Sequence, residues 1–269
     1  MKLEAGQVAV VTGGASGIGF AIAEALAARG VNLAIADIET AALESAVESL
    51  SSKGVEVMGE SVDVASADAV SAFAAKVTGR FGTPQLLFNN AGVGGGGPIA
   101  ELKLDDWRWV LGVNLNGVIH GLDAFLSDMM AAGKPAHVVN TASVAGLVCE
   151  AWMGPYNASK FAVVAISETM ARELAESNVG VSVLCPGFVD TKIAESARNA
   201  PAGAAISEPP AEMGDLLAEL LAGGQKPEQT AARVVEAIES GELYILTHPE
   251  LNPQIEQRIE AIRSALPKP

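Results

Sequence analysis

The hexapeptide PYNASK at residues 155–160 contains a tyrosine and a lysine whose spacing suits proton transfer. Tyr156 precedes Lys160 by four residues, so on a helix their Cβ atoms would lie roughly 5–6 Å apart on one face. Pro155, directly before the tyrosine, is accepted in the first turn of a helix. A neighbouring ammonium group stabilises a phenolate, which would lower the pKa of Tyr156 toward the range of a general acid/base. A surface pair on an ordinary amphipathic helix has the same spacing, so other segments must decide.

A second candidate site is the glycine-rich segment TGGASGIG at residues 12–19. Gly13, Gly17 and Gly19 stand between a strand-like run and a helical one, where they would let the backbone approach a ligand closely. The helix N-terminus that follows would present free N–H groups to a pyrophosphate. The GxxxGxG spacing differs from the commoner GxGxxG, and a tight turn without a ligand would also explain it.

Asp37 ends the second strand-like run, eighteen residues after Gly19, where a carboxylate could bind the hydroxyls of an adenosine ribose. The same carboxylate would repel a 2′-phosphate by about 4 kcal/mol at about 4 Å and an effective dielectric near 20. Neither Ser16 nor Ile38 supplies a cation to offset that repulsion. We therefore expect NAD rather than NADP as cofactor; the alternative is an aspartate that caps the next helix.

Short apolar runs alternate with helical stretches along the chain and would position these residues. The runs are QVAVV, NLAIAD, VEVMGES, QLLFNN, AHVVN, VSVLC and LYIL. Because they are apolar on both faces, they predict a parallel sheet covered by helices on both sides. We expect one doubly wound α/β domain over residues 1–269, with about seven strands. The Ala-, Pro-, Gly- and Glu-rich segment 195–226 interrupts the pattern and predicts a weakly structured substrate loop or lid.

Composition excludes several classes of partner. The 269 residues include 32 acidic and 17 basic side chains, and the net charge of −15 argues against binding nucleic acid or anionic lipid. Interrupted apolar segments fall short of the ~20 residues that span a bilayer, and the first residues lack a signal-peptide pattern. Two cysteines and three scattered histidines predict neither a disulfide framework nor a metal site. The cytoplasm is the simplest compartment.

Over residues 5–191 the chain resembles the short-chain dehydrogenase/reductase superfamily, which has a Rossmann-like fold. The motifs in order are TGGASGIG at 12–19, DV at 63–64, NNAG at 89–92, Asn114, Ser143, YNASK at 156–160 and PG at 186–187. A weaker resemblance, in TGGASGIGF and LYILTHPE, is to the branch containing Cα-dehydrogenases of aryl glycerol ethers and related bacterial alcohol dehydrogenases. The resemblance implies hydride transfer between NAD(H) and a secondary alcohol or ketone.

Roles for individual residues follow from the resemblance. It implies cofactor contacts at Gly13, Ser16, Gly17, Ile18, Gly19, Asp37, Asp63, Val64, Asn90, Ala91, Gly92, Tyr156, Lys160, Pro186, Gly187, Val189 and Thr191. Tyr156 would be the general acid/base, and Lys160 would lower its pKa and hold the ribose. Ser143 would hydrogen-bond the reacting oxygen, and Asn114 would hold a water that relays protons.

The expected substrate pocket is hydrophobic. Cys149, Trp152 and Met153 lie between Ser143 and Tyr156, and Phe188 follows the next strand. The glycines of GVGGGGPI at 92–99 could line this pocket or form a flexible connection. Family members assemble as dimers or tetramers, so a homo-oligomer is expected. Alternatives are another reaction type, such as an epimerase, dehydratase or enoyl reductase, and a non-catalytic NAD(H)-binding sensor.

Overall fold

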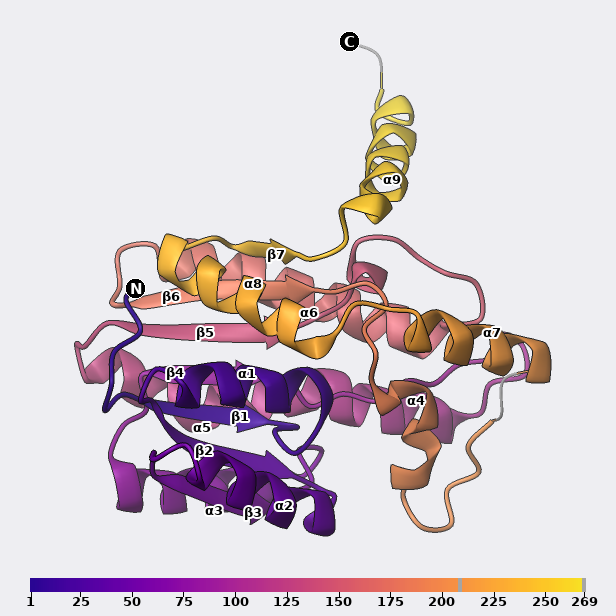
Figure 1. The fold of residues 1–269 in the computed structure, drawn as a ribbon. Coiled ribbons are helices and arrows are strands. Elements are labelled where there is room, and N and C mark those ends of the chain that lie inside the picture. Colours follow the sequence, from indigo (N-terminus) through magenta and orange to yellow (C-terminus); the bar gives the residue numbers. More distant parts are fainter. Residues whose placement is uncertain (208–209, 268–269) are drawn as a thin grey trace.

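The computed structural model of the protein describes residues 1–207 and 210–267 and is built on a parallel sheet (Figure 1). In the described residues the sheet has seven strands in the order β3-β2-β1-β4-β5-β6-β7. The strands are β1 (Val8–Thr12), β2 (Asn32–Asp37), β3 (Val57–Ser61), β4 (Leu86–Asn89), β5 (Ala136–Thr141), β6 (Val179–Cys185) and β7 (Tyr244–Leu246). This confirms the predicted doubly wound α/β fold.

Helices cover both faces of the sheet. One layer contains α1 (Gly17–Ala27), α2 (Thr40–Ser51) and α8 (Pro227–Ser240), and the other contains α3 (Ala67–Phe81), α5 (Gly117–Ala131) and α6 (Gly154–Glu173). Successive strand residues point to opposite faces: in β1, Ala9 and Val11 join the first layer and Val10 joins the second. Strand runs that are apolar at every position are thereby buried on both sides.

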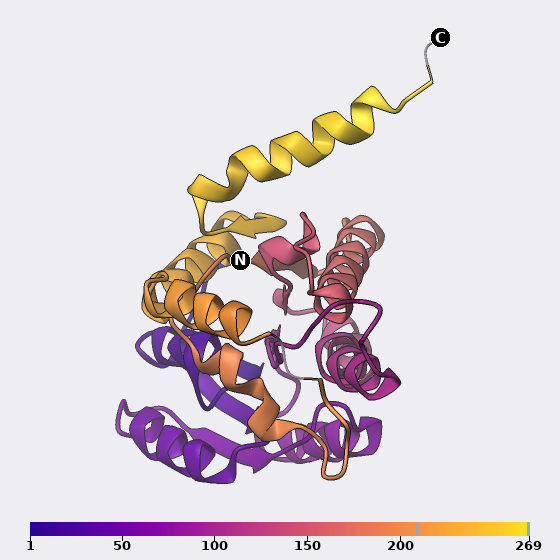
Figure 2. The same ribbon diagram turned by 90° about the vertical axis from the view of Figure 1, so that its right-hand side faces the viewer.

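The order of the strands places a crevice between β1 and β4. The chain runs outward from β1 through β2 to β3, and β4 then pairs with the other side of β1. Helices therefore diverge at the carboxyl ends of β1 and β4, which is where doubly wound sheets bind ligands. Figure 2 looks along the sheet toward this edge, onto which the segment after β6 folds.

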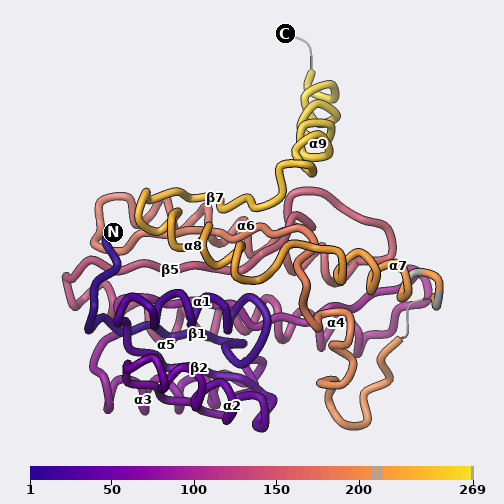
Figure 3. The backbone as a smooth tube through the Cα atoms, viewed as in Figure 1, coloured from indigo at the N-terminus to yellow at the C-terminus, as the bar shows by residue number. Residues whose placement is uncertain are grey.

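Two parts of the chain differ from expectation. The segment 195–226 is more ordered than predicted: it contains the end of a 3₁₀ helix, η3 (Lys192–Asn199), and α7 (Ala211–Ala222), with residues 208–209 outside the described part. Both elements extend past the carboxyl ends of the strands, as the trace in Figure 3 shows. The second difference is α9 (Asn252–Ser264), a C-terminal helix that the strand and helix patterns did not predict.

Candidate active site

A cavity of about 790 Å³ lies at the carboxyl ends of β1, β2 and β4. Many of the predicted cofactor positions are on its wall: Gly13, Ser16, Gly17, Ile18, Asp37, Asp63, Val64, Asn90, Ala91, Gly92 and Thr191. The predicted positions outside this wall are Gly19, Tyr156, Lys160, Pro186, Gly187 and Val189. The volume is within the range of small-molecule sites, about 300–1,000 Å³.

The glycine-rich turn forms a cradle of bare backbone. Gly13 has a positive φ of 64°, and a Cβ at Gly19 would lie 2.1 Å from the Gly13 carbonyl oxygen. Helix α1 begins at Gly17, and its N-cap residue Ser16 makes no side-chain cap hydrogen bond. The first N–H groups of α1 are therefore available to an anion, as a pyrophosphate requires.

Asp37 is held with its carboxylate at the cavity wall. One oxygen accepts a hydrogen bond from the Ala15 N–H and the other from the Glu39 N–H, each at 3.1 Å. Burial raises the pKa of Asp37, and these backbone hydrogen bonds oppose the rise. Helix α2 begins at Thr40 with Glu39 at its N-cap, so the alternative of Asp37 as the N-cap residue is wrong.

Asn90 connects the end of β4 to the glycine-rich turn. Its side-chain amide donates to the carbonyl oxygens of Thr12 at 3.1 Å and Gly13 at 3.3 Å. In return, the Thr12 hydroxyl accepts hydrogen bonds from the backbone N–H groups of Asn90 at 2.9 Å and Ala91 at 3.1 Å. Thr12 therefore shapes the cradle, a role that sequence reasoning missed because the two segments are far apart in the chain.

Tyr156 and Lys160 lie one turn apart near the start of α6, and both are buried. The Lys160 ammonium lies 5.6 Å from the centre of the Tyr156 ring and donates to the Thr141 carbonyl oxygen at 2.9 Å. Burial lowers the pKa of Lys160 to about 8. The two residues thus share one environment, and it is an interior one rather than an exposed helix surface.

In the protein without a bound cofactor, the pKa of Tyr156 is raised and not lowered. Burial raises the pKa of Tyr156 above its usual 10.0, and a hydrogen bond with Ser143 opposes that rise. Burial is the larger effect because removing a phenolate from water is unfavourable, and the Lys160 ammonium is itself buried and donates to the Thr141 carbonyl. In the protein alone, Tyr156 is therefore held as the neutral phenol.

Asn114 lies in a π-helical segment, η1 (Gly112–Asn116), between α4 (Leu104–Leu111) and α5. Its oxygen accepts from the Val93 N–H at 2.8 Å, and its amide donates to the Val93 carbonyl at 3.0 Å. The amide also lies 3.2 Å from the Ser159 hydroxyl. A Cβ at Gly92 would lie 3.4 Å from the Asn114 oxygen and 3.5 Å from the Lys160 nitrogen. Asn114 is thus buried beside Lys160, and the predicted water relay remains a prediction.

Ser143 follows β5 and faces the loop after β6. Its hydroxyl lies 3.4 Å from the Pro186 carbonyl oxygen and accepts from the Ala145 N–H at 3.1 Å. The same loop is held by His248, whose Nδ1 accepts from the Gly187 N–H at 3.0 Å and whose Nε2 is 2.8 Å from the Phe188 carbonyl. His248 is a further residue that sequence reasoning did not place at the site.

The predicted substrate residues are near the site but not on the cavity wall. Cys149 is exposed, Trp152 is 48% exposed with a positive φ of 65°, and Met153 and Phe188 are half-buried. Apolar side chains that do line the cavity include Val93, Trp109, Val113 and Ile193. The glycines at 94–97 pack closely: the Gly97 N–H donates to the Trp152 carbonyl at 2.7 Å.

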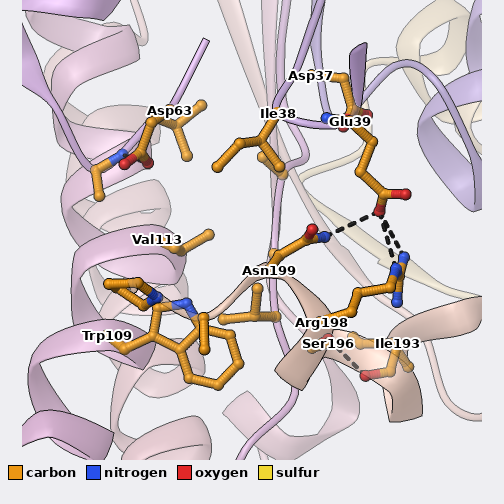
Figure 4. Close-up of a pocket in the computed structure, with 18 of the residues that line it drawn as sticks. Asp37, Ile38, Glu39, Asp63, Trp109, Val113, Ile193, Ser196, Arg198 and Asn199 are labelled. Carbon is orange, nitrogen blue, oxygen red and sulfur yellow. Dashed lines mark hydrogen bonds and ion pairs between the residues drawn. The ribbon is translucent and has the colours of Figure 1, made fainter. Parts of the chain in front are cut away.

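The predicted lid is fastened across the cavity at two points. Arg198 and Asn199 both bind the Glu39 carboxylate, with nitrogen–oxygen distances of 2.6 and 2.9 Å (Figure 4). Farther along, the Ser207 N–H and hydroxyl donate to Asp106 at 2.7 and 2.8 Å. The hydrogen bonds from Asn199 and Arg198 lower the pKa of Glu39. Residues of the segment 192–204 therefore form part of the cavity wall.

Other site types find no support in the part of the chain that the structure describes. Residues 1–207 and 210–267 contain no group of three His, Cys, Asp or Glu side chains placed to hold a metal ion. Nor does any helix within these residues have the length and apolar character needed to cross a membrane.

Comparisons with known proteins agree with this geometry. A family pattern described as short chain dehydrogenase matches residues 7–202. The chain is 37% identical over 260 residues to the C alpha-dehydrogenase of Sphingobium sp. strain SYK-6, covering 95% of this chain and 85% of the relative. It is 36% identical to a CLA biosynthesis dehydrogenase/reductase of Lactiplantibacillus plantarum, covering 95% of this chain and 93% of that one.

A solved structure extends the likeness over the whole fold. A short-chain dehydrogenase/reductase from Burkholderia phymatum, crystallised in complex with NAD, superimposes with a TM-score of 0.95 at 40% identity. The match covers 100% of this chain and 99% of that one. With its doubly wound sheet, glycine cradle and buried Ser143, Tyr156 and Lys160, the chain belongs to the short-chain dehydrogenase/reductase family of oxidoreductases.

Proposed function

We propose that the protein interconverts a secondary alcohol and a ketone with NAD(H), using Tyr156 as general acid/base. The observation that carries the proposal is the burial of Tyr156, Ser143 and Lys160 together at the carboxyl edge of the sheet. The cradle for a dinucleotide opens at the same edge, beside Asp37. Bound NAD(H) would supply the acceptor or donor of hydride.

The three side chains divide the proton chemistry. In reduction the Tyr156 hydroxyl gives its proton to the developing alkoxide, and in oxidation the phenolate takes the alcohol proton. Ser143, whose hydroxyl opposes the rise in the Tyr156 pKa, donates to the same substrate oxygen as charge develops on it. Lys160 supplies a positive charge at 5.6 Å from the tyrosine ring and a donor for the ribose hydroxyls.

The neutral Tyr156 of the protein alone is already in the protonation state that reduction needs. Oxidation requires the phenolate, whose formation burial opposes. The positive charge of an oxidised nicotinamide would favour the phenolate electrostatically. Asn114, buried between the Val93 backbone and Ser159, is proposed to connect Lys160 with solvent through a water.

Support for NAD comes from the position of Asp37 and from the relative whose structure contains NAD. The apolar cavity wall and the likeness to a C alpha-dehydrogenase support a hydrophobic alcohol or ketone as substrate. Cys149, Trp152, Met153 and Phe188 stay in the proposal as residues of the outer pocket. The proposal includes a homo-oligomer acting in the cytoplasm, without nucleic acid or membrane as partner.

The proposed function is tested by following NADH and NADPH oxidation with aliphatic, alicyclic and aryl ketones, comparing the wild type with Tyr156→Phe. We expect NADH-dependent turnover that the substitution lowers by about 10²–10⁴, while NADH binding persists. Near-normal turnover of Tyr156→Phe would remove the tyrosine from the mechanism. Tight NADH binding without turnover of any ketone, or of the matching alcohols with NAD, would instead support a sensor or another reaction type.

A further inference from the structure

Helix α9 (Asn252–Ser264) leaves the body of the protein after β7. All thirteen of its residues are described and none is buried. Figures 1 and 2 both show it standing clear of the sheet and its covering helices. A contact at its middle, with Arg258 at 4.9 Å from the centre of the Phe161 ring, joins it to α6. Most of the helix is thus without a partner in its own subunit.

One side of α9 is apolar. Ile255, Ile259, Ile262 and Leu266 follow one another at intervals of four, three and four residues. That is the spacing of a coiled-coil seam, so the three isoleucines form one stripe along the helix, and Leu266, two residues past its end, continues the same spacing. Ile259, Ile262 and Leu266 are 47%, 51% and 62% exposed. A helix of this length is marginal by itself in water, and an exposed stripe of this kind favours a partner.

We propose that a second copy of the chain covers this stripe, with the two α9 helices packed antiparallel about a two-fold axis. Such an interface is isologous: each helix presents the same surface to the other. In the antiparallel register, Ile259 meets the partner's Ile262, and Ile255 meets the partner's Leu266. Each apolar side chain of the stripe then has an apolar neighbour across the axis.

Charge complementarity selects the second copy and the antiparallel direction. Beside the stripe, Glu256 comes next to the partner's Arg263, and the two-fold axis repeats this pair. A parallel pairing would instead bring Arg258 next to the partner's Arg263, two like charges. The helix itself carries two glutamates and two arginines, so its net charge is zero in a chain of net charge −15. Self-association through α9 therefore avoids the repulsion that the rest of the surface would impose.

The antiparallel pairing leaves room for the α/β domains of both subunits, which are called the two bodies below. At 1.5 Å per residue the helix is about 20 Å long. In the antiparallel pair each body is attached at the N-terminal end of its own helix, so the two bodies lie at opposite ends of the pair. The pairing does not depend on the proposed reaction.

The test is the mass of the purified protein in solution, measured by sedimentation velocity at concentrations from about 1 to 50 μM, a range that brackets a micromolar dissociation constant. The double substitution Ile259→Glu with Ile262→Glu should raise the dissociation constant at least a hundredfold and yield species of half the mass or less. The control places the same two charges on the opposite face of α9, as Gln257→Glu with Ser264→Glu, and should leave the mass unchanged.

A charge exchange tests the direction of pairing. Glu256→Arg alone should weaken the assembly by about tenfold, because each of the two symmetry-related pairs becomes Arg against Arg. Combining it with Arg263→Glu should restore wild-type association. A wild type that is monomeric throughout, or an assembly that survives the double isoleucine substitution, would overturn the proposal. Failure of the charge exchange to restore association would overturn the antiparallel register.

Discussion

Asp37 should decide which dinucleotide the protein uses. Its carboxylate is fixed at the cavity wall by the N–H groups of Ala15 and Glu39. Arg198, a lid cation on the same cavity wall, is paired with Glu39 at 2.6 Å. A 2′-phosphate at about 4 Å would meet a repulsion of about 4 kcal/mol at an effective dielectric near 20, which is about a thousandfold in affinity.

Asp37→Asn removes the charge and keeps the shape of the side chain. We expect the ratio of kcat/KM with NADPH to kcat/KM with NADH to rise by about 10²–10³, mostly through KM for NADPH. The assay is initial-rate oxidation of both cofactors with one ketone, at fixed ionic strength because salt screens the repulsion.

Asp63→Asn is the matched control for this substitution. Asp63 also lines the cavity, and its carboxylate accepts from the Ala65 N–H at 2.9 Å. Its neutralisation should leave the cofactor ratio within about threefold of the wild type. A wild type that prefers NADPH, or an Asp37→Asn ratio that moves no more than the Asp63→Asn ratio, would refute the reasoning.

Three further predictions concern the cradle, the buried lysine and the lid. Gly19→Ala should weaken NADH binding at least about tenfold in calorimetric titration, because its Cβ would lie 2.1 Å from the Gly13 carbonyl oxygen; unchanged affinity would contradict the cradle. The pKa of Lys160 is about 8 in the folded protein against the usual 10.5, so the unfolded chain binds more protons between these values. The free energy of unfolding should therefore rise by about 3 kcal/mol from pH 8 to 10.5 relative to Lys160→Met, in denaturant titrations; parallel pH profiles would contradict it. Glu39→Gln should speed NADH release about two- to fivefold in stopped-flow fluorescence, since it weakens a partly exposed ion pair with Arg198; an unchanged rate would mean that this contact does not restrain the lid.

The strands, the covering helices and the cradle were predictable because their signals are local. Apolar runs bury themselves on both faces of a sheet wherever they fall in the chain, and TGGASGIG carries its own turn and helix start. Tyr156 and Lys160 are one turn apart on α6, so the backbone alone makes them neighbours. Helix α9 was not predicted because its apolar residues form only a narrow stripe, and a helix that packs on the sheet has a wider apolar face.

The sequence by itself thus determined which segments form strands, the glycine-rich cradle and the spacing of the tyrosine and lysine, because each of these depends on a few consecutive residues. Only the tertiary structure decided which distant groups meet, such as Thr12 with Asn90 and Glu39 with Arg198, 159 residues apart. It also decided the direction of the Tyr156 pKa shift, because burial is a property of the whole fold: the neighbouring lysine was visible in the sequence, and the loss of water around the phenol was not.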